Sequence, residues 1–148
     1  MSRIVDHGRN KMLESIELGT NLRMSEVSAA IGRVQLRHLE SWTKQRQKNS
    51  KSINHSTKLR ENAEHAWHQL CVLSENPDDL IAKFDSAGID ARVHYPKPCN
   101  KHEVYAGHYQ HTEDLHVSEK VSSRLVAIPV HPSLSSEDIQ RINSVLNP

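Results

Sequence analysis

The segment Gly19-Thr-Asn21-Leu-Arg23-Met-Ser25-Glu-Val-Ser-Ala-Ala-Ile-Gly-Arg-Val-Gln-Leu36 decides the fold, because it contains the start of the longest regular element in the sequence. Ser25 is a favourable N-cap, and the acidic residue after it suits the positive end of a helix. From there to about residue 60 the sequence has no proline, and apolar residues recur at roughly helical spacing. The pattern predicts one long helix over residues 25–60, or two helices with a kink near residues 40–44.

Residues 1–24 lack a periodic apolar pattern and are predicted to form an irregular lead-in loop that carries Gly-x-Asn-x-Arg. Beyond residue 60 the pattern alternates between strands and helices, and it predicts a small α/β domain over residues 61–148. The elements expected there are strands at 66–73, 89–95 and 125–130, a helix from Pro77 that closes at Gly88, and helices at about 113–124 and from about 136. This order predicts the α/β (α+β) class, with a small, mostly antiparallel sheet covered by helices on one face.

The composition is typical of a water-soluble protein with the size of one domain, since 36% of the 148 residues are hydrophobic and 25% are charged. No apolar run approaches the roughly 20 residues that a membrane-spanning helix needs, and the N-terminus lacks a signal-peptide pattern. We therefore expect a cytoplasmic protein without a membrane partner. Cys71 and Cys99 have no metal-ligand spacing, and a lone cysteine pair in the cytosol is usually reduced.

The net charge of +1 conceals an uneven distribution. Residues 1–60 hold twelve basic and five acidic residues, a difference of +7, whereas residues 61–148 hold seven basic and thirteen acidic residues, a difference of −6. Because residues 24–39 superficially resemble a helix-turn-helix, a DNA-binding protein that uses the basic half is an alternative. Within that segment, however, no clear turn occurs. The basic run from Lys44 to Lys51 has no aromatic residue for base stacking and is interpreted as a solvated helix face, so a nucleic-acid partner is not favoured.

Several short motifs of this sequence occur together in one enzyme family. They are the Gly-x-Asn-x-Arg-Met loop with the following Ala-Ala-Ile-Gly-x-x-Gln-Leu helix, His65-Ala-Trp67-His68, Asp78-Asp79-Leu80 with Ala87-Gly88-Ile89, His94-Tyr95-Pro96-Lys97-Pro98, and Ala127 to Ser135 followed by Glu137-Asp138. On these residues the chain resembles the DegT/DnrJ/StrS-type sugar aminotransferases, which use pyridoxal phosphate (PLP). The resemblance runs from about His7 to the end, and it implies the C-terminal small domain of a fold-type I PLP aminotransferase.

The resemblance assigns two residues to the cofactor. In the family, the loop asparagine, here Asn21, reaches into the neighbouring subunit and donates to the PLP phosphate, with the following arginine, here Arg23, nearby. On chemical grounds alone, an amide and a guanidinium ahead of a helix N-terminus can also form an anion site. The alternative is that Asn21 accommodates a strained turn and that Arg23 pairs with a local acid such as Glu26.

The resemblance also places the segment that begins at His94 and Tyr95 near the sugar of a nucleotide-sugar substrate, with Asn100 and Tyr105 as further candidates. Asn100 stands where a histidine is often found in the family, and Thr20 and Leu22 replace aromatic residues that are frequent beside the loop asparagine. The alternative is that His94 and Tyr95 simply pack at the edge of a loop.

The lysine that binds PLP covalently in the family belongs to a large domain that would precede this segment. None of the lysines from Lys11 to Lys120 lies in that sequence context. We therefore expect these 148 residues to hold no catalytic residue and no covalently bound PLP of their own. Either a partner chain supplies the large domain, or the chain is a truncated, non-catalytic remnant. The expected role is assembly or completion of an active site, as a homodimer or with a separate large-domain chain, through an apolar stripe from Val27 to Trp42.

The eleven histidines raise the question of a metal site. The candidates His102, His108, His111 and His116 do not follow a His-Glu-x-x-His pattern, and Gly107 argues against a helix that would place two rings on one face. No metal is expected.

Overall fold

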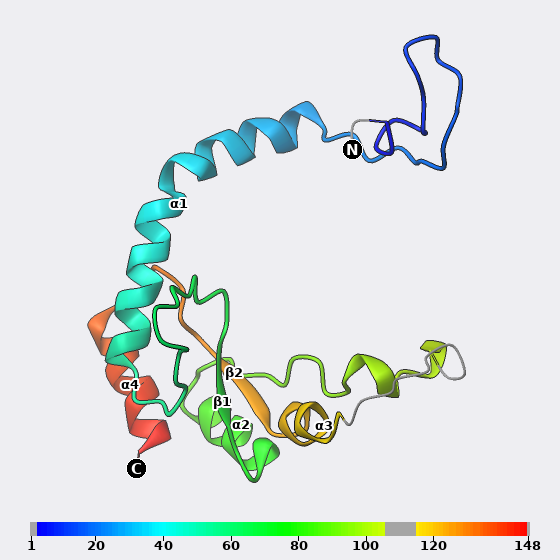
Figure 1. Ribbon diagram of the computed structural model, residues 1–148. Coiled ribbons are helices and arrows are strands. Elements are labelled where there is room, and N and C mark those ends of the chain that lie inside the picture. Colours follow the sequence, from blue (N-terminus) through cyan, green and yellow to red (C-terminus); the bar gives the residue numbers. More distant parts are fainter. Residues whose placement is uncertain (1–2, 106–114, 148) are drawn as a thin grey trace. The chain divides into compact units, whose positions relative to one another are not determined.

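The computed structural model describes residues 3–105 and 115–147, and it contains helices, short 3-10 turns and two strands (Figure 1). The elements are α1 (Glu26–Ser52), β1 (Leu70–Leu73), α2 (Pro77–Ser86), η1 (Cys99–Lys101), η2 (Glu103–Tyr105), α3 (His116–Ser122), β2 (Leu125–Ile128) and α4 (Ser136–Leu146). The chain divides into two compact units, Met1–Glu40 and Ser41–Pro148, which we call the N-terminal unit and the C-terminal unit. This is the mixed α/β architecture that the sequence predicted.

The lead-in of the N-terminal unit is irregular, as expected, but backbone hydrogen bonds close it into a defined loop. The amide of Thr20 donates to the carbonyl of Ile4 at 2.9 Å, and the amide of Ile16 donates to the carbonyl of Gly8 at 3.0 Å. Gly8 has a φ of +69°, and a Cβ atom there would lie 1.7 Å from the carbonyl oxygen of Glu17. Only glycine fits this position, because both the backbone conformation and the close approach exclude a side chain.

Helix α1 begins where the sequence predicted, because the Oγ atom of Ser25 accepts a hydrogen bond from the amide of Ser28 at 3.1 Å. It is one helix from Glu26 to Ser52, so of the two alternatives from the sequence, the single long helix is the one observed. The helix-turn-helix interpretation was wrong, since Gly32 lies inside the helix and no turn follows it. The predicted end near residue 60 was also wrong. The helix ends at Ser52, and Ile53, which is only 3% exposed, joins the hydrophobic core.

The sheet of the C-terminal unit consists of β1 and β2, paired antiparallel with Leu70 opposite Ile128 and Leu73 opposite Leu125. Strand β1 is therefore shorter than the predicted 66–73. The strand predicted at residues 89–95 was wrong, because the structure has only a single antiparallel bridge between Arg92 and Ala127. The pairing stops there for a local reason. Tyr95 has a φ of 58°, and the proline after it has no amide to donate to a neighbouring strand.

The core of the C-terminal unit lies between the sheet and its helices. Phe84 of α2 and Ile142 of α4 are 0% and 1% exposed, and they pack with the inner side chains of both strands. Helix α4 begins with a capping box in which the side chains of Ser135 and Asp138 accept hydrogen bonds from each other's backbone amides. Gly88 follows α2 with a φ of +68°, as predicted for a left-handed cap. Helix α3 is shorter than expected, and the first two residues of its predicted range lie outside the described residues.

Polar contacts hold the C-terminal half of α1 to the other elements of the C-terminal unit. Asn49, which is buried, donates through Nδ2 to the carbonyl of His131 at 2.7 Å. Asn143 of α4 accepts from the amide of Asn54 at 2.8 Å and donates to the carbonyl of Ser52 at 2.9 Å. The last turns of α1 contain almost no apolar side chains, and these hydrogen bonds explain how they are held in place. Among the described residues, no helix combines the length and apolar character that crossing a membrane would require.

Candidate functional site

The two residues assigned to the cofactor lie together in the N-terminal unit. The Nε atom of Arg23 donates to Oδ1 of Asn21 at 3.1 Å, and the backbone amide of Arg23 donates to the same oxygen at 3.4 Å. Arg23 pairs with Asp6 through Nη1, at 3.6 Å from Oδ1. The sequence alternative, an ion pair with a local acid, therefore describes part of the arrangement, but the acid is Asp6 and not Glu26.

This arrangement fixes the orientation of the Asn21 amide. Arginine has only donor groups, so the Asn21 atom that faces it must be the oxygen. The amide nitrogen Nδ2 then points away from Arg23, and it donates no hydrogen bond within the described residues. The side chain is exposed. An outward amide donor beside a guanidinium is an arrangement that suits an anionic ligand.

Of the candidate substrate residues, His94, Tyr95 and Asn100 line clefts of the C-terminal unit, and His94 lines two of them. We call the first the polar cleft. It has a volume of about 600 Å³ and is lined by Arg46, His68, Gln69, Asp90, Arg92, His94, Ala127, Ile128, Pro129, Val130 and His131. We call the second the apolar cleft, which has a volume of about 780 Å³. Both volumes are in the range of small-molecule sites.

The apolar cleft lies between the segment after His94 and the helix α3. Tyr95 and Asn100 line it as well. Tyr95 is 78% exposed, and its positive φ is uncommon for a residue with a side chain. Asn100 donates through Nδ2 to Oε1 of Glu119 at 2.9 Å, so its amide also ties the loop to α3. Tyr105 ends the turn η2 and is not among the residues that line this cleft.

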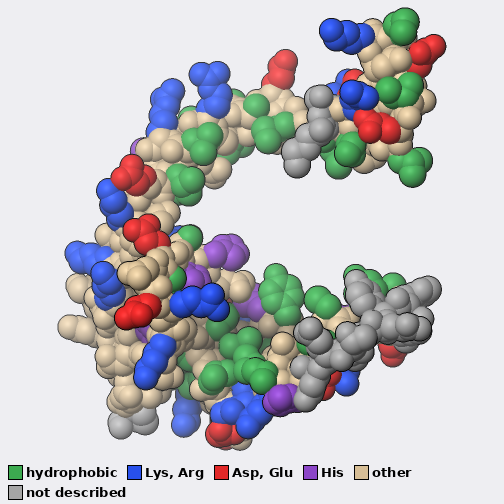
Figure 2. Space-filling view, viewed as in Figure 1, with side chains coloured by type: hydrophobic (Ala, Val, Ile, Leu, Met, Phe, Trp, Pro, Cys, Tyr) green, Lys and Arg blue, Asp and Glu red, His purple; other side chains and the backbone are tan. Residues whose placement is uncertain are grey.

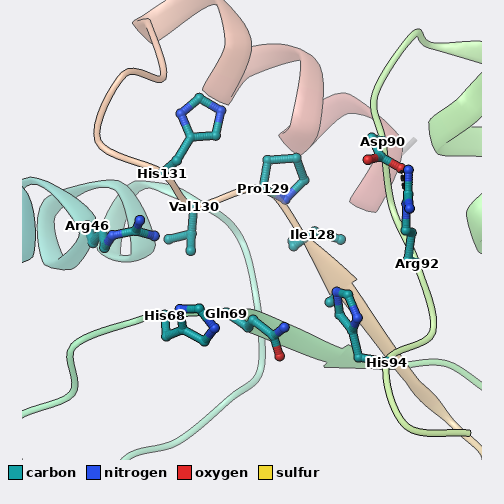
Figure 3. Close-up of a pocket in the computed structure, with 11 residues that line it drawn as sticks. Arg46, His68, Gln69, Asp90, Arg92, His94, Ile128, Pro129, Val130 and His131 are labelled. Atoms are coloured by element: carbon teal, nitrogen blue, oxygen red, sulfur yellow. Dashed lines mark hydrogen bonds and ion pairs between the residues drawn. The ribbon is translucent and has the colours of Figure 1, made fainter. Parts of the chain in front are cut away.

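The polar cleft contains residues that the sequence did not indicate. Figure 3 shows Arg46, His68, Gln69 and His94 around the segment from Ile128 to Val130, which runs through the middle of the view. Arg46 comes from α1, His68 and Gln69 precede β1, and His94 follows the bridge at Arg92. Arg46 was interpreted as part of a solvated helix face, and that interpretation was wrong for this residue. Its side chain is half-buried, and Nη1 donates to the carbonyl of Trp67 at 3.3 Å.

Charge in the polar cleft is predominantly basic. Its single carboxylate, Asp90, accepts a hydrogen bond from Nε of Arg92 at 2.8 Å. This bond, together with the attraction between the two charges, raises the pKa of Arg92 above its ordinary value, so the guanidinium stays charged. Elsewhere, Cys71 and Cys99 are free thiols, and burial raises the pKa of the Cys71 thiol.

No group of three or more histidine, cysteine, aspartate or glutamate side chains in the described part of the chain is arranged to hold a metal ion. Of the histidines considered for a metal, His102 and His116 belong to that part, and His108 and His111 lie outside it.

Residues 1–147 match the DegT/DnrJ/EryC1/StrS aminotransferase family. The chain belongs to this family. It is 30% identical over 139 residues to the erythromycin biosynthesis sensory transduction protein EryC1 of Saccharopolyspora erythraea, covering 86% of this chain and 37% of that protein. It is 28% identical over 135 residues to the dTDP-3-amino-3,4,6-trideoxy-alpha-D-glucose transaminase of Streptomyces venezuelae, covering 84% of this chain and 35% of that one.

The fold agrees with solved structures of the family. A DegT/DnrJ/EryC1/StrS aminotransferase from Brucella abortus has a TM-score of 0.88 and 27% identity, covering 98% of this chain and 41% of that one. The chain therefore spans less than half the length of the relatives that it matches. Since these relatives are considerably longer, the match shows family membership for residues 1–147 and leaves the activity of a whole aminotransferase to the longer proteins.

Proposed function

We propose that this chain supplies the C-terminal small domain and an active-site loop of a PLP-dependent nucleotide-sugar aminotransferase. Asn21 and Arg23 bind the PLP phosphate of a neighbouring active site, and the segment from His94 contacts the sugar nucleotide. The observation that carries the proposal is the match to the family over residues 1–147, combined with the outward Nδ2 donor of Asn21. Names of relatives support the substrate class, since one of them is a transaminase of a dTDP-linked amino sugar.

The residues present fit the phosphate of the cofactor. Asn21 presents two N–H bonds on the side away from Arg23, and the guanidinium keeps donors that Asp6 and Asn21 do not use. When bound, PLP supplies an electron sink for amino transfer. The contribution of this chain is to hold and orient the phosphate with fixed hydrogen bonds. The 3.6 Å ion pair with Asp6 orients Arg23 for that task.

The substrate side lies in the C-terminal unit, where His94, Tyr95 and Asn100 line one cleft. We propose that His94 and Tyr95 contact the sugar and that Asn100 positions their loop through its bond to Glu119. Tyr105 contributes from the neighbouring turn. A positive φ at Tyr95 is a strained conformation of the kind that occurs at binding sites, and the Tyr95 side chain is 78% exposed.

The N-terminal half of α1 supports a role in assembly. Val27, Ile31 and Val34 follow one another at helical spacing, and each is at least 54% exposed. Figure 2 shows apolar side chains along one side of this part of α1 and basic side chains along the other. We propose that the apolar side packs on a neighbouring aminotransferase subunit, and that residues 1–148 do not transfer amino groups by themselves, because their lysines lack the family's context.

Reconstitution tests the proposal. The chain is combined with a polypeptide that carries the lysine-bearing large domain of a family member, and amino transfer to a nucleotide-linked keto sugar is measured. We expect activity only from the combination, and we expect Asn21→Ala to reduce it about tenfold or more through the loss of a hydrogen bond to a charged group. Thr20→Ala is the matched control, since the Thr20 side chain makes no hydrogen bond among the described residues.

Two results would contradict the proposal. One is equal activity from the large-domain polypeptide without this chain. The other is a stoichiometric pyridoxyl adduct on the chain alone after incubation with PLP and borohydride, measured by intact mass. That adduct would show that a specific lysine within residues 1–148 forms a Schiff base with PLP.

A further inference from the structure

The polar cleft gathers donors that the protein itself does not use. Arg46 donates one N–H to the carbonyl of Trp67, at 3.3 Å, and its remaining N–H groups form no hydrogen bond among the described residues. The imidazole rings of His68 and His94 likewise form no hydrogen bond within residues 3–105 and 115–147. Figure 3 shows all three side chains around the same space. Polar groups in a cleft that lack protein partners are available to a ligand.

The signs of the charges select the class of ligand. The cleft is lined by two arginines and three histidines against one aspartate, and that aspartate is already paired with Arg92. A guanidinium repels metal cations, whereas arginine and histidine donors match the oxygens of phosphate groups. The donors also come from three separate segments, which start in α1, before β1 and after the bridge at Arg92. A ligand with several oxygens can satisfy such a spread of donors.

We propose that the polar cleft binds a diphosphate group, with Arg46, His68 and His94 as the donors. The site differs from the cofactor residues Asn21 and Arg23, which lie in the N-terminal unit. Its assignment to the diphosphate of the sugar nucleotide rests on the proposed function, while the diphosphate site itself does not. Because His94 lines both clefts, a diphosphate held there would leave the sugar portion of the same ligand to the apolar cleft.

The experiment is a titration of the 148-residue chain with inorganic pyrophosphate, followed by NMR of the histidine rings. We expect saturable shifts of the His68 and His94 signals. Arg46→Gln should weaken the binding about tenfold or more, because it removes a charged donor from the ligand. Arg46 also bonds to the Trp67 carbonyl, so His68→Ala provides a second variant whose side chain is exposed and makes no structural bond. It should weaken binding several-fold.

Lys83→Ala is the matched control, because Lys83 is an exposed cation on α2 that does not line the cleft. Absence of saturable shifts, or equal weakening by Lys83→Ala and by the cleft variants, would overturn the site. A parallel titration with dTDP or UDP tests the source of the diphosphate. Tighter binding than inorganic pyrophosphate supports the sugar nucleotide, and equal binding removes that assignment. Failure of the reconstituted aminotransferase alongside intact pyrophosphate binding would reject the proposed function and leave the site in place.

Discussion

The N-terminal and C-terminal units are stabilised by different means. Between residues 3 and 40, Gly8 is the one buried residue, and the loop is closed by backbone hydrogen bonds such as that from Thr20 to Ile4. In the C-terminal unit, both strands and the helices α2 and α4 share a hydrophobic core. A unit without a core gains little free energy from burial. The N-terminal unit is therefore held in its conformation mainly by backbone hydrogen bonds, and most of its side chains remain exposed.

This difference explains why the two units carry different parts of the proposed function. A loop with exposed side chains and a fixed amide at Asn21 is suited to insertion into a neighbouring active site. A domain with a packed core can instead hold Arg46, His68 and His94, which come from distant parts of the sequence, around one cleft. Substitutions that affect one unit and leave the other unchanged test this division.

The largest effect is expected from removal of a core side chain. Phe84→Ala should destabilise the C-terminal unit by about 3–5 kcal/mol, because Phe84 is 0% exposed and its loss leaves a cavity. Chemical denaturation followed by the fluorescence of the two tryptophans, Trp42 and Trp67, measures the change. Val117→Ala is the control, since Val117 is 61% exposed on α3 and should cost less than about 0.5 kcal/mol. Similar costs for the two variants would contradict a core centred on Phe84.

A smaller and more local effect is expected in the N-terminal loop. Gly8→Ala should disrupt the loop, because a Cβ atom would lie 1.7 Å from the Glu17 carbonyl oxygen at a φ of +69°. The left-handed conformation alone costs about 1–2 kcal/mol for alanine. Hydrogen exchange at the Ile16 and Thr20 amides should accelerate, while denaturation of the C-terminal unit should not change.

Gly32→Ala is the matched control for the loop variant. Apart from its chain neighbours and the backbone of the surrounding helix turns, no described atom lies within 4 Å of the Cβ position at Gly32, so the substitution should only strengthen α1, by up to about 1 kcal/mol. If Gly8→Ala shifted the denaturation midpoint of the C-terminal unit, the two units would not be independent in stability.

The cap of α4 is expected to have an intermediate effect that depends on pH. Ser135→Ala should cost about 1 kcal/mol, and Ser136→Ala, which is exposed and makes no side-chain bond among the described residues, should cost less. Hydrogen bonds from the backbone and side chain of Ser135 lower the pKa of Asp138 below its ordinary value of 3.8. Because the pKa of Asp138 is lower in the folded state than in the unfolded state, its ionised carboxylate stabilises the fold at pH values above the ordinary pKa. This stabilisation is lost as the pH falls through the folded-state pKa.

The pH dependence follows from that sign. Ser135→Ala removes one of the two bonds, so the pKa of Asp138 should move back toward its ordinary value. The decline in stability on acidification below about pH 4 should then be shallower than in the original protein. Thermal denaturation between pH 2 and 7 measures it, and an unchanged acid slope would show that the backbone amide alone accounts for the shift.

The elements predicted well from the sequence are those set by adjacent residues. Ser25 and Gly88 act within one turn of a helix, so their outcome needed no information about distant residues. The strand at 89–95 failed because strand formation depends on a partner, and the positive φ at Tyr95 ends the pairing after one bridge. The polar cleft could not be predicted, since it exists only when α1, the segment before β1 and the segment after Arg92 are brought together.

The smallest effect is expected at Asp90, and it concerns the ligand more than the fold. Asp90 and Arg92 are both 70% exposed, so breaking their ion pair should leave the denaturation midpoint unchanged. Asp90→Asn removes the carboxylate from the polar cleft and should strengthen binding of inorganic pyrophosphate about two- to threefold at low salt, with less gain at high salt. Asp85→Asn, an exposed change on α2 outside the cleft, controls for net charge. Weaker binding in Asp90→Asn would mean that Arg92 also contacts the ligand and needs Asp90 to orient it. Removing the repulsion between Asp90 and the ligand can only strengthen binding, so a weakening must come from the loss of that orientation.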